Sequence, residues 1–198
     1  MFDTIKDFIQ RKILRNRQAR LNYQYEKGAW DFLKDPVEFE RQHLCNQFIQ
    51  KYKPHSTIIE IGCSEGMFIE HIINKGEYAR YLGVDVSDFV VSKATERLGD
   101  EKTSFLQNDM DSFTIQEVFD VIFYNESLNY AASIVNTLHY SIKHMMKPDA
   151  IFVISLHEHK HSDTYWSEVH KVLKPIESQK VTNQRGVWQV EVLQPIKK

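Results

Sequence analysis

A glycine loop between an apolar segment and a helical segment is the first feature that suggests chemistry. The apolar run 57–61 leads into Gly62 and Gly66, and Glu60 precedes the first glycine by two positions. Gly62 permits a tight turn and a close backbone approach, and Gly66 lets a following helix begin against a sheet. Two glycines at this spacing also occur in purely structural turns. The strand before them, the helix after them and Glu60 together favour a ligand-binding loop.

A second acidic residue, Asp85, ends the next apolar run. An acid at this position can accept hydrogen bonds from both hydroxyls of a ribose, in dinucleotide-binding and in adenosylmethionine-binding enzymes alike. A dinucleotide loop reads G-x-G-x-x-G and turns its amides toward a pyrophosphate, which a carboxylate such as Glu60 would repel. S-adenosylmethionine carries a sulfonium and an ammonium. The loop therefore favours S-adenosylmethionine over NAD.

Residues 57–156 resemble the class I S-adenosylmethionine-dependent methyltransferase family. The first motif of that family, E/D-x-G-x-G-x-G, is matched by Glu60, Gly62 and Gly66. Ser64 stands in place of the middle glycine, where relatives tolerate small residues. Asp85 matches the family's ribose-binding acid.

Three later segments carry the same resemblance. Asp109 and Met110 follow the third expected strand, where the family places an adenine-contacting acid and its neighbour. Segment 119–126 matches the fourth motif, whose strand end lies beneath the methionine portion of the cofactor. Segment 146–155 resembles the turn before strand five. The resemblance implies S-adenosylmethionine as cofactor and the following cofactor-binding residues: Glu60, Gly62, Cys63, Ser64, Gly66, Asp85, Val86, Asp109, Met110 and Asn125.

A shorter resemblance concerns the acceptor. Segments 25–30 and 125–130 are similar to the NodS-like group, which methylates nitrogen on amino sugars and whose bacterial neighbours act on saccharides. This likeness implies N- or O-methylation of a small polar acceptor, with a saccharide, an amino sugar or a nucleotide sugar favoured.

The residues after strands four and five are the candidates for catalysis, because ligands gather beyond the carboxyl ends of parallel strands. Glu126 is placed to orient an amine or accept a proton, although a solvated carboxylate is the alternative. His157 or His159 is placed to act as a base near neutral pH. The alternation of histidines at 157, 159 and 161 also suits a metal, but no second ligand cluster accompanies it. We predict no metal site.

Aromatic residues near the start of the chain are candidates for contact with the acceptor. Tyr25 and Trp30 precede the expected core, and Tyr130 follows strand four. Aromatic faces suit a sugar ring or a cationic amine. The alternative is that they anchor the N-terminal helices. Cys63 is expected to fill space in the glycine loop and not to act as a nucleophile.

Strands and helices alternate along most of the chain, which predicts a parallel sheet covered on both faces. The expected fold is α/β: a Rossmann-like, mostly parallel, seven-stranded class I methyltransferase sheet with one antiparallel edge strand. Residues 1–53 would form a helical N-terminal extension and residues 54–198 the core of one structural domain. The pattern predicts helices at 3–21, 36–52, 66–74, 87–98, 133–146 and 163–173. It predicts strands at 57–61, 78–84, 103–107, 119–124 and 150–156, and a hairpin of 176–181 with 187–193.

Composition narrows the class of protein. The 198 residues are 42% hydrophobic and 26% charged with a net charge of -2, so DNA binding is not expected. No stretch reaches the roughly 18–20 apolar residues of a membrane span, and no secretory signal is recognisable, so we expect a cytoplasmic protein without stable membrane insertion. Residues 1–21 are basic, which suits a solvated cover, a self-association surface or contact with phosphate or an anionic membrane. Either a monomer or a homodimer is compatible with the sequence.

Two other functions remain open. RNA or protein methylation is one, although the N/D-P-P-Y/F motif of adenine and glutamine amide methylation is missing after strand four. A non-catalytic adenosylmethionine-binding module is the other.

Overall fold

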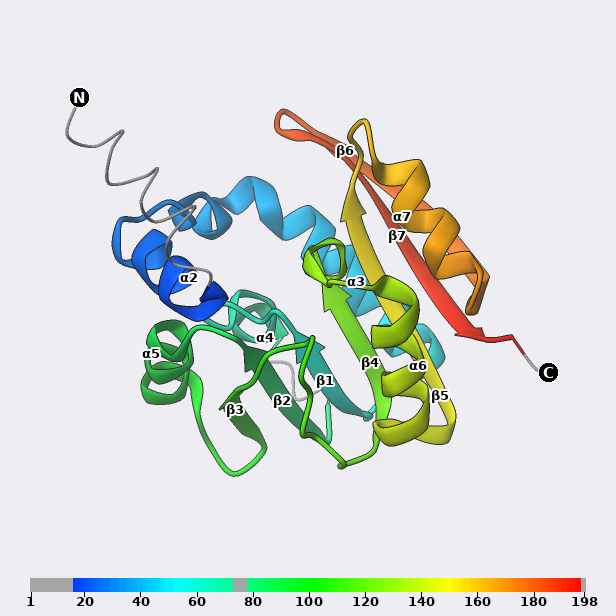
Figure 1. Cartoon of the computed structure of the whole chain (residues 1–198), viewed down its shortest axis with the longest axis horizontal. Coiled ribbons are helices and arrows are strands. Elements are labelled where there is room, and N and C mark those ends of the chain that lie inside the picture. Colours follow the sequence, from blue (N-terminus) through cyan, green and yellow to red (C-terminus); the bar gives the residue numbers. More distant parts are fainter. Residues whose placement is uncertain (1–15, 73–77, 197–198) are drawn as a thin grey trace.

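A seven-stranded sheet forms the centre of the molecule (Figure 1). The structure is a computed structural model that describes residues 16–72 and 78–196. The strand order is β3-β2-β1-β4-β5-β7-β6. The strands are β1 (Thr57–Ile61), β2 (Arg80–Asp85), β3 (Thr103–Gln107), β4 (Phe119–Asn125), β5 (Met146–His157), β6 (Leu173–Asn183) and β7 (Gly186–Pro195). The first five are parallel, and the predicted class I methyltransferase fold is confirmed.

The expected antiparallel strand is β7, which pairs with β5 on one side and β6 on the other. It lies one position in from the edge, and β6 is the edge strand. Burial explains this order. The middle of β7, including Val190 and Val192, is buried, whereas most of β6 is exposed. The strand with more apolar surface to bury therefore takes the inner place.

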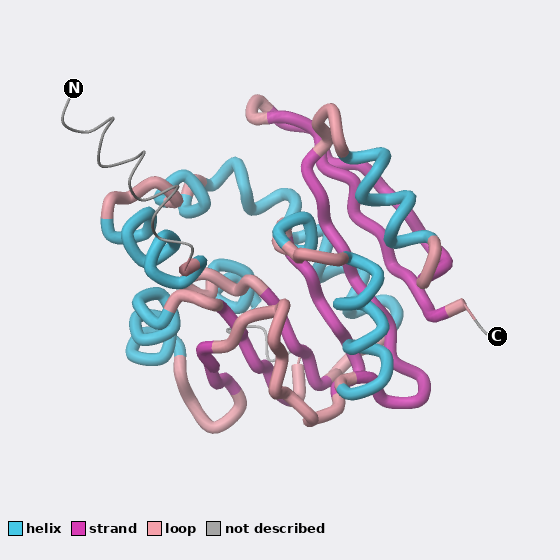
Figure 2. The backbone as a smooth tube through the Cα atoms, viewed as in Figure 1, coloured by secondary structure: helices cyan, strands magenta, loops and turns pink. Residues whose placement is uncertain are grey.

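Helices cover both faces of the sheet (Figure 2). Successive side chains of a strand point to opposite faces, so neighbours on β1 and β4 join different cores. Ile59 and Ile122 pack with α6 (Ile134–His144) and α7 (Ser162–His170). Ile58 and Phe123 pack with α3 (Phe39–Tyr52) and α4 (Met67–Ile72). The remaining helix of the parallel half, α5 (Asp88–Leu98), packs against β2 and β3.

The described N-terminal part holds the α-helices α2 (Arg17–Glu26) and α3, with the short 3-10 helices Asp31–Lys34 and Pro36–Glu38 between them. Helix α3 buries Leu44, Cys45, Phe48 and Ile49 in the same core as β1, β4 and β5. Helix α2 packs against α5 instead. The helix expected at 3–21 falls partly outside the described residues. Its described part continues five residues further than expected, through Tyr23 and Tyr25, and the chain leaves the helix before Gly28, whose φ is 69°.

The parallel arrangement has one consequence for function. The carboxyl ends of β1, β2, β3, β4 and β5 meet at one edge of the sheet, and α2 lies over that edge (Figure 1). Loops that are far apart in the sequence are therefore brought together beneath the N-terminal helix.

Candidate functional site

A cavity of about 680 Å³ opens at the carboxyl ends of the parallel strands. Its walls come from the loops after β1, β2, β3, β4 and β5, from α2 and α3, and from the β6–β7 hairpin. Every site residue expected from the sequence lines it except Gly66. The expected residues that line it are Tyr25, Trp30, Glu60, Gly62, Cys63, Ser64, Asp85, Val86, Asp109, Met110, Asn125, Glu126, Tyr130, His157 and His159.

The two loop glycines are required by the chain itself. Gly62 has a φ of 87°, and a Cβ on it would lie 2.3 Å from the Cβ of Ser127. Gly66 lies behind the loop, where a Cβ would meet Leu98 and Phe105. Gly62 therefore allows the loops after β1 and β4 to touch, and Gly66 allows the start of α4 to pack closely against its neighbours.

Asp85 is held by the backbone at the end of β2. Its carboxylate accepts hydrogen bonds from the amides of Ser64, at 3.0 Å, and Ser87, at 2.9 Å. Burial raises the pKa of Asp85. Two fixed amides orient the carboxylate and leave further lone pairs for donors such as ribose hydroxyls.

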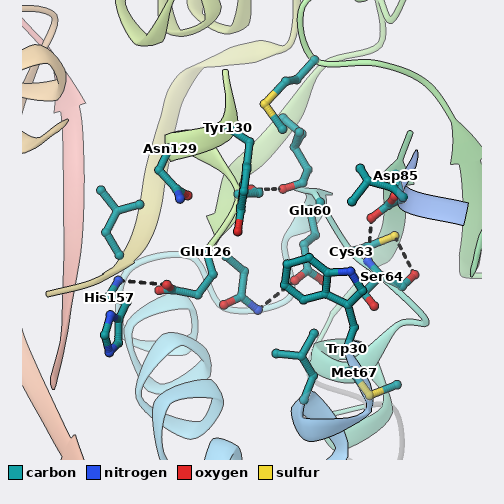
Figure 3. A pocket seen from close by; sticks show the side chains of 18 of the residues that line it. Trp30, Glu60, Cys63, Ser64, Met67, Asp85, Glu126, Asn129, Tyr130 and His157 are labelled. Atoms are coloured by element: carbon teal, nitrogen blue, oxygen red, sulfur yellow. Dashed lines mark hydrogen bonds between the residues drawn. The ribbon is translucent and has the colours of Figure 1, made fainter. Parts of the chain in front are cut away.

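Glu60 is a buried carboxylate at the end of β1. Figure 3 shows Glu60 among the residues that line the cavity. It is 1% exposed, and it accepts hydrogen bonds from the hydroxyl of Tyr81 and, at 3.0 Å, from Nδ2 of Asn125. Burial raises its pKa to about 7, although these hydrogen bonds and the charge of Arg41 oppose the shift. A cation placed beside Glu60 would compensate the burial of its charge. The site therefore fits a cationic ligand such as the sulfonium cofactor expected from the sequence.

Arg41 is a cavity residue that sequence reasoning missed. It lies on α3, is 2% exposed, and donates to Oδ1 of Asn125 and, at 3.4 Å, to Oε2 of Glu38. Asn125 thus links Arg41 to Glu60. The signal in the sequence is weak: Arg41 falls four residues before Cys45, on the buried stripe of its helix, where a charged side chain is uncommon.

Helix α2 covers the end of the cavity that Ser64 and Asp85 line. Tyr25 forms a side-chain hydrogen bond with Ser64, and burial raises the pKa of the Tyr25 phenol. At the other end of the helix, Arg17 donates to Asp109 at 2.7 Å and to Asp111 at 2.5 Å. Asp109, expected to contact adenine, is therefore also an anchor for the cover.

Glu126 has an unusual backbone conformation directly after β4. Its φ is 58°, a left-handed value that side-chain-bearing residues seldom adopt. Its carboxylate accepts hydrogen bonds from Oγ of Ser155, at 2.7 Å, and from the amide of His157, at 2.8 Å. Two donors on β5 thus fix this carboxylate at the wall of the cavity, and Figure 3 shows the bond from the His157 amide.

The two candidate histidines are less favourably oriented for a base. The Nε2 atom of His157 lies against Gly186, where a Cβ would come within 2.3 Å of it, and the ring packs edge-on against Trp188. In His159, Nδ1 accepts a hydrogen bond from the amide of His161 at 3.2 Å. A neutral His159 then carries its proton on Nε2. Geometry favours Glu126 over both histidines.

In residues 16–72 and 78–196, no group of three or more His, Cys, Asp or Glu side chains is arranged to hold a metal ion. None of the helices in these ranges is long and apolar enough to cross a membrane. Cys63 is buried, and burial raises the pKa of its thiol, which leaves it protonated.

A family model described as a methyltransferase domain matches residues 52–194. The chain belongs to the methyltransferase domain family. Among curated proteins, this methyltransferase domain is 25% identical over 164 residues to malonyl-(acyl-carrier protein) O-methyltransferase 2 of Ilyobacter polytropus. The match covers 81% of the chain and 61% of the relative. A second relative is the malonyl-(acyl-carrier protein) O-methyltransferase of Anoxybacillus flavithermus, which is 28% identical over 85 residues. This match covers 43% of the chain and 33% of the relative. The chain thus spans about three fifths or less of their length.

Solved structures agree on the fold of the domain. The N-methyltransferase NodS of Bradyrhizobium japonicum, in complex with S-adenosylhomocysteine, superposes with a TM-score of 0.73 at 19% identity, covering 85% of this chain and 92% of NodS. A Haloferax volcanii protein in complex with the Trm112 methyltransferase activator gives a TM-score of 0.71 at 16% identity, covering 87% and 96%. The predicted class, a class I S-adenosylmethionine-dependent methyltransferase domain, is confirmed by family and fold.

Proposed function

We propose that this protein transfers the methyl group of S-adenosylmethionine to a small polar acceptor, with a saccharide or amino sugar favoured. One observation carries the proposal. A single cavity joins the buried acids Glu60 and Asp85 to the fixed carboxylate of Glu126. A cationic cofactor and an acceptor group can therefore lie end to end within it.

The cofactor would be held by residues at the carboxyl ends of β1, β2 and β3. Asp85 would accept hydrogen bonds from the ribose, and Val86, Asp109 and Met110 would border the adenine. Glu60, through its negative charge, would favour the cationic methionine portion. When bound, S-adenosylmethionine supplies an activated methyl group, whose carbon–sulfur bond breaks with its electron pair left on sulfur while the acceptor's lone pair forms the new bond.

The chain's own residues contribute orientation and proton removal. Glu126 would accept the proton that the acceptor releases, and its two hydrogen bonds keep the carboxylate in place meanwhile. Tyr25, Trp30 and Tyr130 line the same cavity and offer aromatic faces to a sugar ring or an amine. His157 and His159 remain secondary candidates for the base.

Other activities have specific support. The curated relatives are named for the malonyl group of an acyl-carrier protein, so a carrier-bound carboxylate is a rival acceptor. The fold is shared with a protein that binds an activator, which makes an activator subunit an alternative to a monomer or homodimer. RNA or protein methylation and a non-catalytic binding role complete the alternatives.

Calorimetric titration with S-adenosylmethionine tests the cofactor assignment first. We expect binding by the wild type and a loss of roughly 1–3 kcal/mol in Asp85→Ala, the cost of charge-assisted hydrogen bonds. Asp149→Ala, an exposed carboxylate outside the cavity, is the control. Equal affinity in all three proteins would remove Asp85 from the ribose role. Release of S-adenosylhomocysteine with sugar and amino-sugar probes then separates an enzyme from a binding module.

A further inference from the structure

The acceptor end of the cavity offers hydrogen-bond acceptors. Glu126 presents a carboxylate there, and Asn129 lies on the same side of the cavity (Figure 3). The Oδ1 atom of Asn129 is buried and has no hydrogen-bond partner within the described part of the chain. A buried amide oxygen without a partner is unfavourable. A ligand that brings an N–H or O–H group to this end would satisfy it.

Glu126 is fixed as well as charged. A left-handed φ is costly for a residue with a side chain, and the chain retains it here while Ser155 and the His157 amide hold the carboxylate. Ser155 is fully buried on β5, so its hydroxyl has little freedom to move. The negative charge of Glu126 also acts on its neighbour Tyr130. Burial is the main cause that raises the pKa of the Tyr130 phenol, and the charge of Glu126 is the second.

The cations in the cavity wall are already paired. Arg17 binds Asp109 and Asp111. Arg41 binds Glu38, and Arg185 binds Asp35 at 2.8 Å and approaches Glu38 at 3.7 Å. Within residues 16–72 and 78–196, the three arginines that line the cavity are thus neutralised by carboxylates of the same chain. An anionic acceptor would meet Glu126 with no uncommitted arginine from this part of the chain to offset the repulsion.

We propose that this site accepts groups that donate a hydrogen bond from the atom to be methylated, an amine or a hydroxyl, and rejects carboxylates. Glu126 is the specificity-determining residue and Ser155 is its positioning residue. The inference rests on the proposed function. One consequence is that a malonyl thioester, which carries a free carboxylate, is rejected. This chain would then differ from its curated relatives, which are named for a malonyl group.

The proton balance follows from the same geometry. The nitrogen or oxygen of the acceptor forms one bond to the methyl carbon, and the bond from that carbon to sulfur breaks with its electrons left on sulfur. The hydrogen of the acceptor, already directed at Glu126, leaves as a proton to that carboxylate and then to solvent. A carboxylate acceptor has no such hydrogen to direct.

Four probes test the specificity. D-glucosamine, D-glucose and D-glucuronate are sugars of similar size that differ in their amine and carboxylate groups, and malonyl-coenzyme A carries the malonyl thioester. The readout is release of S-adenosylhomocysteine from S-adenosylmethionine by the full chain. We expect transfer to an amine or hydroxyl of glucosamine or glucose, and no methyl ester on the carboxylate of glucuronate or malonyl-coenzyme A, as checked by mass spectrometry of the products. Glu126→Gln should lower transfer to the accepted probes by about 10²-fold or more and reduce the preference over glucuronate at least about tenfold. Glu168→Gln, at a partly exposed glutamate on α7 outside the cavity lining, is the matched control.

Ser155 separates positioning from mere folding. Ser155→Ala should raise KM for the accepted probe about tenfold while the affinity for S-adenosylmethionine stays unchanged, and Ser155→Thr, which keeps the hydroxyl, should restore much of the loss. A parallel loss of cofactor affinity would mean that Ser155 only supports the fold. This variant retains the Glu126 charge, so it tests the site even if Glu126→Gln fails to fold.

The outcomes are distinguishable from failure of the proposed function. Methyl ester formation on glucuronate or malonyl-coenzyme A at rates equal to transfer to the amine and hydroxyl probes overturns the inference and leaves methyl transfer standing. Transfer to none of the probes contradicts both statements. An unchanged acceptor preference in Glu126→Gln removes Glu126 from the specificity role.

Discussion

Three of the carboxylates that line the cavity differ in the groups that donate hydrogen bonds to them. Asp85 is oriented by two backbone amides, and Glu126 by one amide and one hydroxyl. Glu60 receives its hydrogen bonds from side chains only, and burial moves its pKa into the neutral range. Glu60 is therefore poised to change its charge near neutral pH when a cation binds beside it.

We predict that cofactor binding strengthens as pH rises through about 7, because the cationic cofactor favours the charged form of Glu60. Below this pKa the affinity should change by up to about tenfold per pH unit, since one proton is released on binding. The charged groups that influence Glu60 are Arg41, which lowers its pKa, and Asp85, which raises it. Calorimetry between about pH 6 and pH 8, in buffers of different ionisation enthalpy, measures both affinity and proton release.

The variant Glu60→Gln should bind more weakly and lose most of this pH dependence. The sign for stability is opposite. A pKa raised from 4.5 to about 7 contributes stability below 4.5 that is lost as pH rises through 7, so the ligand-free Gln variant should gain stability relative to wild type at about pH 8. Equal cofactor affinity of the wild type across the range would contradict the role given to Glu60.

At the scale of elements, the loops after β1 and β4 meet through Gly62. Gly62→Ala combines a left-handed φ with a Cβ placed 2.3 Å from that of Ser127. Strain and overpacking of this kind together cost about 2–4 kcal/mol. Chemical denaturation should show this loss, and adding Ser127→Gly should recover the overpacking part. If the single variant is as stable as wild type, the two loops are not in contact as described.

Helix α2 is attached at three places along its length. Arg17 binds the loop after β3, Asn22 bonds to Ser87 and Asp88 at the start of α5, and Tyr25 bonds to Ser64. None of its residues is fully buried, so these polar contacts carry much of its docking. Because α2 lies over the cofactor end, its opening should govern how quickly the cofactor enters and leaves.

Arg17→Ala should therefore accelerate release of S-adenosylhomocysteine several-fold with little change in global stability. The physical reason is that partly exposed ion pairs contribute about 1 kcal/mol or less each. Stopped-flow fluorescence is suitable, since Trp30 lines the cavity. Arg20→Ala, on the same helix but outside the cavity lining, is the control. Identical release rates in wild type and Arg17→Ala would rule out α2 as the barrier.

At the scale of the whole molecule, local patterns predicted the fold well. β1 and β3 have the boundaries expected from their apolar runs. β5 begins four residues earlier than expected. The sequence misses this extension because these residues are partly exposed and include Pro148 and Asp149, residue types that indicate a turn. The sequence predicts the antiparallel strand at the edge of the sheet, whereas β7 lies one position inside. Predicting this order requires knowing which strand of the hairpin is buried, and burial depends on tertiary packing.

Some residues of the site can be predicted from local sequence patterns, and others cannot. Residues in one continuous motif, such as Glu60 and Ser64, were found because strand, turn and helix follow one another in the chain. Arg41 and Ser155 were not, since their partners Asn125 and Glu126 lie 84 and 29 positions away. Pairings across such separations leave no local pattern. Glu126 was selected for its place after β4, but its left-handed backbone is visible only in three dimensions.

A ligand that joins the loops of several strands to the covering helix should stabilise the whole domain. A ligand present at 100 times its Kd adds about 2.7 kcal/mol to the free energy of unfolding. For a chain of this size, that corresponds to a rise in Tm of about 5–11 °C. We expect S-adenosylhomocysteine to produce such a shift, and Asp85→Ala to reduce it at the same ligand concentration because its Kd is higher. Adenosine alone should give a smaller shift, since it leaves Glu60 without a cation. A full shift with adenosine would mean that the methionine end contributes little, and that Glu60 does not bind the cofactor.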